Sequence, residues 1–179
     1  MKLLLYLILI FTGGNLFAQC TPSTPNPDCI TALTLTVGGA CVNGTTCGGA
    51  AETASTCLYA GSECSWYEFT ATATNMYVQI EVTSTSGCHI SSNVYEATAP
   101  CVGTEISCLS GAPLDDVHSL TGLTVGTTYY VQICYSPGGP CGRNGSAEYC
   151  ISVGEPDPPC DLCSTPCGTA QGFTSAPTV

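Results

Sequence analysis

Ser65-Trp66-Tyr67-Glu68-Phe69-Thr70-Ala71, followed closely by Met76-Tyr77-Val78-Gln79-Ile80-Glu81-Val82, is the stretch that decides the fold. In both segments large apolar residues alternate with polar or amphipathic ones, and a period of two is the pattern of a β-strand with one buried face. The alternation predicts that Tyr67 and Phe69 of the first segment, and Val78 and Ile80 of the second, face a common core.

The short polar link at residues 72–75 suggests that the two strands form an antiparallel hairpin. A register that places Phe69 opposite Val78 also places Tyr67 opposite Ile80, so one pairing brings the core residues together. The alternate residues then share the other face: Trp66, Glu68 and Thr70 with Tyr77, Gln79 and Glu81.

Similar alternation recurs along the chain, and no stripe of period 3.6 accompanies it. Leu33, Leu35 and Val37 alternate in the first such segment, and turns rich in Gly, Pro, Asn and Asp separate those that follow. About eight short strands in a single unit predict an all-β fold, an antiparallel β-sandwich. The further strands are expected at residues 89–96, 104–109, 117–120, 127–135 and 147–153.

The composition excludes several classes of protein. The 179 residues include 2 Lys and Arg against 13 Asp and Glu, and charged residues make up 8% of the chain. Two cations cannot neutralise a row of phosphates, so no nucleic-acid partner is expected. Helical bundles need charged helix faces and are not expected either. Abundant Thr, Ser, Gly and Cys are typical of an extracellular β-protein.

Residues 1–18 have the three parts of a Sec signal peptide. Lys2 precedes an apolar run from Leu3 to Phe11, and the small residue Ala18 stands at the expected cleavage site. The run is too short for a transmembrane span, which needs about 20 residues. A lipid anchor on Cys20 is the alternative, but Gln19 is not the small residue that a lipoprotein signal requires.

The remaining chain divides into three parts. Residues 19–31 are rich in Pro, Thr and Ser and predict an extended leader, whereas residues 32–154 carry the strands. Residues 155–179 begin with Glu155-Pro156-Asp157-Pro158-Pro159 and have no strand pattern. This segment indicates a Pro- and Cys-rich linker and the start of a further module.

All 15 cysteines follow the signal peptide. In an oxidising compartment most are expected to form disulfides, and the odd number leaves one free or paired outside this chain. Cys134 and Cys150 fall on the non-core face of two strands expected to be neighbours, so a cross-strand disulfide between them is one candidate. The tail contains a CxxC at residues 160–163 and a third cysteine at 167, but no nearby residue supplies the fourth ligand that a zinc site needs. Eight cysteines are taken as disulfide candidates: Cys29, Cys41, Cys57, Cys64, Cys101, Cys108, Cys134 and Cys150.

Two motifs are similar to those of pre-peptidase C-terminal (PPC-like) domains: WYxFTA at residues 66–71, and residues 120–133, where turn glycines precede an aromatic strand. Asp28-Cys29 with Ala32, and Cys101 with Cys108, resemble the cysteine-rich variants in large exported proteins of Gram-negative bacteria, many of which use type IX secretion. The resemblance covers about residues 27–154. It implies a jelly-roll-like β-sandwich that accompanies catalytic or adhesive modules and has no catalytic residues of its own. A fibronectin type III domain, which shares the Gly-Thr-x-Tyr stretch, is the second candidate.

The motifs do not predict a catalytic site. Cys88-His89 brings a nucleophile next to a base, but neighbours on a strand point to opposite faces. His118 with Asp115-Asp116 offers two parts of a triad, yet no Ser lies in a Gly-x-Ser-x-Gly turn. Glu68 and Glu81 offer a carboxylate pair, although a solvated sheet face is the ordinary place for such residues.

Ligand binding has more support than catalysis. Trp66, Tyr77 and Tyr130 fall on faces opposite the expected core, where an aromatic ring can stack on a sugar. Covering a sheet edge is the ordinary alternative for Trp66. Asp115 and Asp116 lie in a turn and could either bind Ca²⁺ or stabilise the turn itself. No other cofactor is expected.

Together these patterns predict a secreted, non-catalytic accessory module, extracellular or at the cell surface, that binds or spaces partner domains. Its partners would be other domains of the same polypeptide, a glycan or a cell-surface protein. Two alternatives stay open. One is a carbohydrate-binding module with Trp66 as its platform, and the other is the N-terminal fragment of a secreted hydrolase whose catalytic domain lies beyond residue 179.

The fold should depend on its disulfides, because the strands carry few large apolar residues and each disulfide restricts the unfolded chain. Mature protein kept in reductant is expected to lose its cooperative thermal transition or to melt at a much lower temperature. Circular dichroism of the oxidised and the reduced chain measures this difference. Identical melting curves would contradict the prediction.

Overall fold

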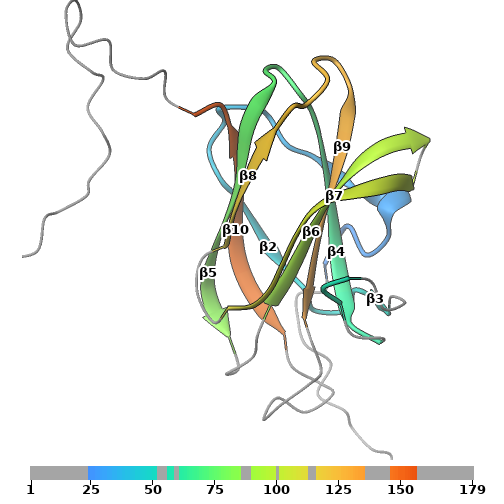
Figure 1. Ribbon diagram of the computed structural model, residues 1–179. Coiled ribbons are helices and arrows are strands. Elements are labelled where there is room, and N and C mark those ends of the chain that lie inside the picture. The colour runs from blue at the N-terminus through green and yellow to red at the C-terminus, as the bar shows by residue number, and fades with distance from the viewer. Residues whose placement is uncertain are drawn as a thin grey trace, which may run out of the picture.

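Two β-sheets packed face to face form the described part of the chain (Figure 1). The computed structural model describes residues 24–51, 56–58, 61–85, 90–99, 101–112, 116–135 and 146–156. Within these ranges the chain forms eight strands of four or more residues, two strands of two residues and one turn of 3-10 helix. The all-β, antiparallel, disulfide-rich sandwich predicted from the sequence is confirmed.

The first sheet contains β1 (Leu33–Thr34), β4 (Glu63–Thr70), β9 (Thr128–Tyr135), β6 (Ile90–Ala99) and β7 (Val102–Ala112) in this order, and β3 (Ala50–Ala51) also pairs with β4. The second sheet has the order β2 (Val42–Thr45), β10 (Ala147–Gly154), β5 (Asn75–Thr85) and β8 (Asp116–Thr121). Paired strands are antiparallel except for β1 and β4, which are parallel. The 3-10 helix η1 (Cys29–Thr31) precedes β1.

The core lies between the sheets and comes from alternate residues of the long strands, as the period of two predicted. Rings from neighbouring strands stack within it: the centroids of Phe69 and Tyr129 are 5.6 Å apart, with planes 21° from parallel. Burying these side chains supplies the main apolar stabilisation of the fold. The larger core residues are Tyr67, Phe69, Ile90, Val94, Tyr129, Val131 and Ile133 from the first sheet, and Met76, Val78, Ile80, Leu120, Tyr149, Ile151 and Val153 from the second.

The predicted hairpin of residues 65–71 with residues 76–82 is wrong. β4 pairs with β9, where Phe69 lies opposite Tyr129, whereas β5 pairs with β10 and β8 in the other sheet. The link after Ala71 therefore crosses the sandwich instead of turning back along one sheet. The predicted core faces of the two strands are nevertheless correct, because strands that face one core from opposite sheets show the same alternation as hairpin neighbours.

The predicted Cys134–Cys150 disulfide is also wrong, since β9 and β10 belong to different sheets. Cys134 instead joins Cys64, its direct neighbour on β4, with the two Cα atoms 4.1 Å apart. Cys47 is disulfide-bonded as well. The eight candidate cysteines form the four disulfides in which both partners are described: Cys29–Cys101, Cys41–Cys150, Cys57–Cys108 and Cys64–Cys134.

The N-terminal segment runs along the edge of the first sheet. Leu35 is buried in the core as predicted, whereas Leu33 is exposed and Val37 only partly covered. Further upstream, Asn26 is fully buried: its side chain donates to the carbonyl of Trp66, and its own carbonyl accepts the Trp66 N–H at 2.9 Å. The described part of residues 19–31, expected to be an extended leader, is thus hydrogen-bonded to β4.

Two of the predicted segments fall outside the described ranges, wholly or for the most part. The signal peptide at residues 1–18 does so entirely, and of the linker at 155–179 only Glu155 and Pro156 are described. Within the described ranges no helix is long and apolar enough to cross a membrane.

Gly44 of β2 lies where two core tyrosines meet. The hydroxyl oxygens of Tyr67 and Tyr149, one from each sheet, are 3.1 Å apart. Burial raises the pKa of both phenols, so both hydroxyls stay neutral at physiological pH. A Cβ atom on Gly44 would overlap the Tyr67 hydroxyl and the Tyr149 ring. The missing side chain is therefore a packing requirement of this tyrosine pair.

Gly44→Ala is expected to destabilise the fold by about 1–3 kcal/mol, because the extra methyl group forces a well-packed pair apart. The control is Asn43→Ala at the adjacent position, where the side chain is exposed and should matter by less than about 0.5 kcal/mol. Urea unfolding of both variants measures the difference. Equal stability of the two variants would show that the tyrosine pair has room to move.

Candidate functional site

The outer face of the first sheet carries two rows of polar and aromatic side chains. Both rows run across β4, β9, β6 and β7, and they lie two residues apart on β4, β9 and β6 but three apart on β7, where the register shifts after Val94. Their neighbours in sequence, such as Tyr67 and Val131, are buried in the core, so both rows face away from it. The first row is Trp66, Gln132, Asn93 and Cys108, and the second is Glu68, Tyr130, Tyr95 and Glu105.

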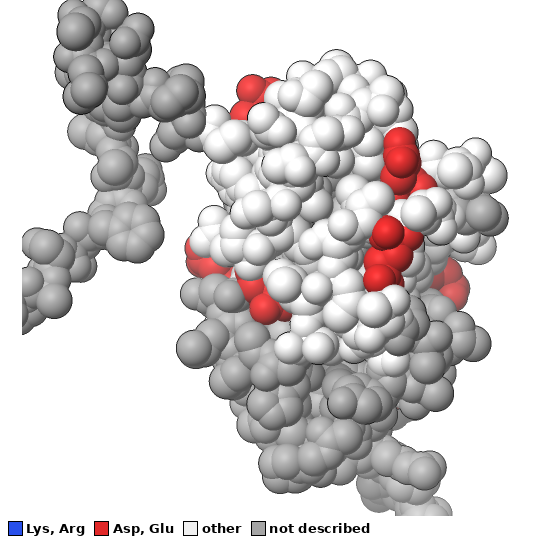
Figure 2. Space-filling model, viewed as in Figure 1, with Lys and Arg blue, Asp and Glu red and all other residues white. Residues whose placement is uncertain are grey.

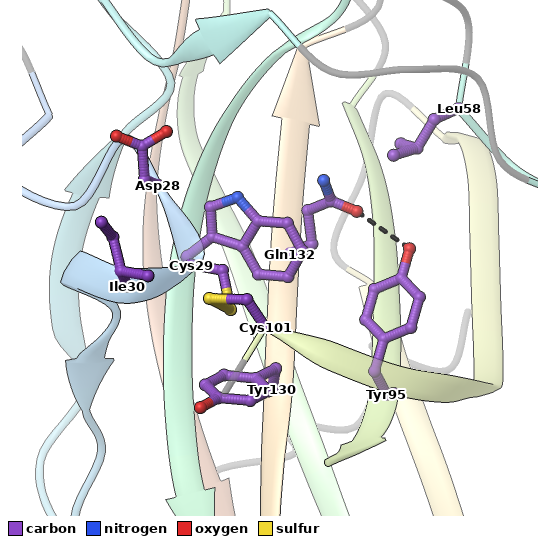
Figure 3. A pocket seen from close by; sticks show the side chains of 10 residues that line it. Asp28, Cys29, Ile30, Leu58, Tyr95, Cys101, Tyr130 and Gln132 are labelled. Atoms are coloured by element: carbon purple, nitrogen blue, oxygen red, sulfur yellow. Dashed lines mark hydrogen bonds between the residues drawn. A yellow bond between two sulfur atoms is a disulfide. The ribbon is translucent and has the colours of Figure 1, made fainter. Parts of the chain in front are cut away.

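A pocket of about 580 Å³ is formed over these rows (Figure 3). Side chains of three neighbouring strands make its floor, and its walls come from η1, the start of β7 and the residues between the elements. The floor residues are Trp66, Tyr95, Tyr130 and Gln132, and the wall residues are Asp28, Cys29, Ile30, Leu58, Cys101 and Gly103.

The aromatic floor is held in place by a chain of hydrogen bonds. The Tyr95 hydroxyl donates to Oε1 of Gln132 at 3.0 Å and accepts from the Asn93 amide at 2.8 Å. The same amide nitrogen donates to Oε2 of Glu105 at 3.1 Å. Beside Tyr95 lies the indole of Trp66, with ring centroids 5.9 Å apart and planes tilted by 31°. Tyr95 is thereby fixed next to Trp66, and both rings remain partly exposed.

Disulfides hold both walls of the pocket. Cys29–Cys101 connects η1 to the turn between β6 and β7, and both cysteines line the pocket together with Tyr130 (Figure 3). Cys57–Cys108 attaches the segment that carries Leu58 to β7. Among the described residues Cys101 is the one non-glycine with a positive φ, 60°, a conformation that costs energy for an L-residue. The covalent link holds this turn against the pocket.

The sequence pointed to part of this site. Trp66 and Tyr130, two of the three predicted binding residues, lie together in the pocket. The third, Tyr77, belongs to β5 of the second sheet, where its ring covers Gly154. Tyr95 was missed, although it follows the core residue Val94 and the alternation along β6 would have pointed it outward.

The described residues contain no Lys or Arg. The carboxylates are accordingly the visible charges in the space-filling view (Figure 2). In the second row, Glu68 stands next to Tyr130 and Glu105 next to Tyr95. The two tyrosines of the pocket floor therefore stand between two acidic residues.

A second group of polar side chains lies between β6, β7 and β8. Ser92 Oγ is 2.9 Å from Asp116 Oδ2 and 2.9 Å from His118 Nε2, and Ser107 Oγ is 2.7 Å from His118 Nδ1. One proton arrangement satisfies all three contacts. Ser107 donates to Nδ1, the Nε2–H donates to Ser92, and Ser92 donates to the Asp116 carboxylate.

This buried group does not have the order of a catalytic triad. In a triad the carboxylate orients the histidine, whereas here Asp116 accepts from the serine. Ser92, Asp116 and His118 are all buried, and burial lowers the pKa of His118 to about 4. A neutral imidazole suits the proton arrangement above. The Cys88-His89 pair considered from the sequence lies outside the described residues.

The predicted calcium ligands are only partly described. Asp116 is buried with Ser92, and Asp115 lies outside the described ranges. Among the described residues no group of three or more His, Cys, Asp and Glu side chains could hold a metal ion. Calcium binding at Asp115 and Asp116 stays a prediction.

No protein-family model and no curated protein matches the chain. The solved structures include a similar one, PliG of Aeromonas hydrophila, a periplasmic lysozyme inhibitor of g-type lysozyme. The two are 14% identical over 68% of this chain and 95% of that chain, with a TM-score of 0.37. A function for this chain therefore has to come from the chemistry of its own side chains.

His118 should make the fold less stable in acid. Its folded pKa of about 4 lies below the usual 6.5, so the unfolded chain takes up its proton first. The stabilisation is complete above about pH 6.5 and is lost as the pH falls towards 4, by about 2–3 kcal/mol at pH 4.5. Urea unfolding at about pH 7.5 and about pH 4.5 measures the loss.

The matched variant is His118→Gln, which keeps a donor and an acceptor but does not titrate. Its stability should fall less between the two pH values than that of the natural chain, and this comparison removes the contribution of carboxylates and of His89. Parallel pH profiles for the two chains would refute the assignment to His118.

Proposed function

We propose that this chain is an exported, non-catalytic β-sandwich module that binds a carbohydrate in the pocket over Trp66, Tyr95 and Tyr130. It would act as an accessory to other domains of the same polypeptide or at the cell surface. The observation that carries the proposal is that three adjacent strands each contribute one aromatic ring to the floor of one open pocket.

The chemistry of the floor suits a sugar ring. A pyranose has an apolar face of C–H groups that packs on an aromatic ring and an edge of hydroxyl groups that needs hydrogen-bond partners. Trp66 and Tyr95 offer the ring faces, and the Tyr95 hydroxyl and the Gln132 amide lie at their margin. Because Asn93 and Gln132 already fix Tyr95, little side-chain entropy is lost when a ligand binds.

The absence of catalysis in this proposal is supported by the Ser92–His118 group. Its histidine is enclosed in the sandwich, and Asp116 bonds the serine instead of the imidazole. A substrate would have to open the packing between β6, β7 and β8 to reach Ser92. We therefore assign this group a role in stability.

Export is supported by the cysteines. Each of the nine in the described residues is disulfide-bonded, and such bonds persist in oxidising compartments. The predicted signal peptide at residues 1–18 would deliver the chain to such a compartment, in agreement with this proposal.

Glycan-array screening followed by calorimetry on the strongest hit tests the function. Trp66→Ala should weaken binding about tenfold or more, because it removes the larger ring of the platform. Tyr95→Phe keeps the ring but loses the hydroxyl, and should weaken binding by a smaller factor.

Tyr77→Ala provides the control, because Tyr77 belongs to the second sheet and should leave affinity unchanged. Circular dichroism confirms that each variant is folded. An array without hits, or a hit whose affinity falls for Tyr77→Ala and not for Trp66→Ala, would reject the pocket as the binding site.

A further inference from the structure

The charged residues around the pocket say more about its ligand than the shape of the pocket does. Glu68 and Glu105 stand at the two ends of the row that contains Tyr130 and Tyr95, and each lies directly opposite one of these tyrosines. Side chains in such positions have Cβ atoms about 5 Å apart. A third carboxylate, Asp28, belongs to the wall beside η1.

The carboxylates of Glu68 and Glu105 accept hydrogen bonds from uncharged groups. Thr34 donates to Oε1 of Glu68 at 3.0 Å, and the Asn93 amide donates to Oε2 of Glu105. Neither donor carries a charge, and the described residues include no Lys or Arg. The negative charge around the floor is therefore not neutralised by the described part of the chain, and it disfavours an anionic ligand.

The aromatic rings of the floor also attract cations. The faces of Trp and Tyr rings attract cations that lie within about 6 Å of the ring centre, and the attraction grows when the cation is shielded from water. Trp66 and Tyr95 lie side by side, and Tyr130 is next to Tyr95 on the adjacent strand. Rings and carboxylates thus favour the same kind of ligand group.

We propose that the group recognised in this pocket is an organic cation, an ammonium carried by a sugar or by a side chain, held over the aromatic rings between Glu68 and Glu105. This inference rests on the proposed binding function and specifies its ligand. Amino sugars and lysine side chains both supply the required chemistry, and a neutral sugar supplies only part of it.

The single tryptophan of the chain makes the first test direct, because fluorescence changes on binding come from Trp66 in the pocket. Choline is compared with 3,3-dimethylbutan-1-ol, in which a carbon atom replaces the charged nitrogen at nearly unchanged shape. Choline should bind about tenfold more tightly than the neutral alcohol. Its affinity should fall when NaCl is raised from about 50 mM to about 0.5 M.

Two further ligand pairs distinguish the sources of the cation. A glucosamine hexamer is compared with its N-acetylated form, and hexalysine with its Nε-acetylated form, which lacks the charges. A preference for the charged member of either pair supports the proposal, and the pair that binds more tightly identifies the carrier. If only hexalysine binds, the cation inference stands and the carbohydrate of the proposed function is rejected.

Charge-neutralising variants test the residues. The triple variant Asp28→Asn, Glu68→Gln, Glu105→Gln should lose about tenfold in affinity for choline. The matched control, Glu81→Gln, Glu148→Gln, Glu155→Gln, removes the same net charge from the strands of the second sheet and the residue after β10, and should stay within about twofold.

Equal affinity for choline and its neutral counterpart, or equal losses in the two triple variants, would overturn the inference. If neutral glycans bind through Trp66 while no cation does, the proposed function stands and the inference falls. If no ligand of either kind binds through Trp66, both are rejected.

Discussion

The pairing of β4 with β9 is the constraint on which the rest of the molecule depends. Eight consecutive residue pairs, from Glu63 with Tyr135 to Thr70 with Thr128, fix these central strands to each other. Every second residue then enters the core, and every other one stands on the outer face of the sheet. A slip of one residue would exchange the two sets, placing Trp66 and Gln132 in the core and Tyr67 and Val131 in solvent. The Cys64–Cys134 disulfide holds the same register covalently.

Alternation in the sequence identified the longer strands and the core faces of β4 and β5, because a period of two depends only on neighbouring residues, but the short strands β2 and β3 were missed. It could not identify partners. Residues 65–71 and 76–82 show the pattern of a hairpin, yet the link after Ala71 crosses to the other sheet. The same ambiguity produced the wrong Cys134–Cys150 pairing. Partner choice depends on contacts distant in sequence, such as that between Tyr67 and Tyr149, which no local pattern contains.

The candidate site, too, could be predicted from the sequence only in part. Trp66 and Tyr130 could be found because each directly precedes a core residue, Tyr67 and Val131, in a strand with clear alternation. Tyr77 shows the same pattern but lies on the other sheet. Alternation indicates which side of its strand a residue faces, and it does not indicate to which sheet the strand belongs. The walls could not be predicted, because η1 and Leu58 reach the pocket through Cys29–Cys101 and Cys57–Cys108, which join positions 72 and 51 residues apart. The group of Ser92, Ser107 and His118 likewise brings together residues from three strands.

Because disulfides hold the walls of the pocket, the complete pocket can form only after these bonds have formed. The floor needs only strand pairing, but η1 and the Leu58 segment are fastened to it by bonds that form under oxidising conditions. A newly made chain in the reducing cytosol would lack these two fastenings, even if its strands paired early. For the exported binding module proposed above, ligand capture would begin only after export, and molecules of similar chemistry inside the producing cell would not be bound.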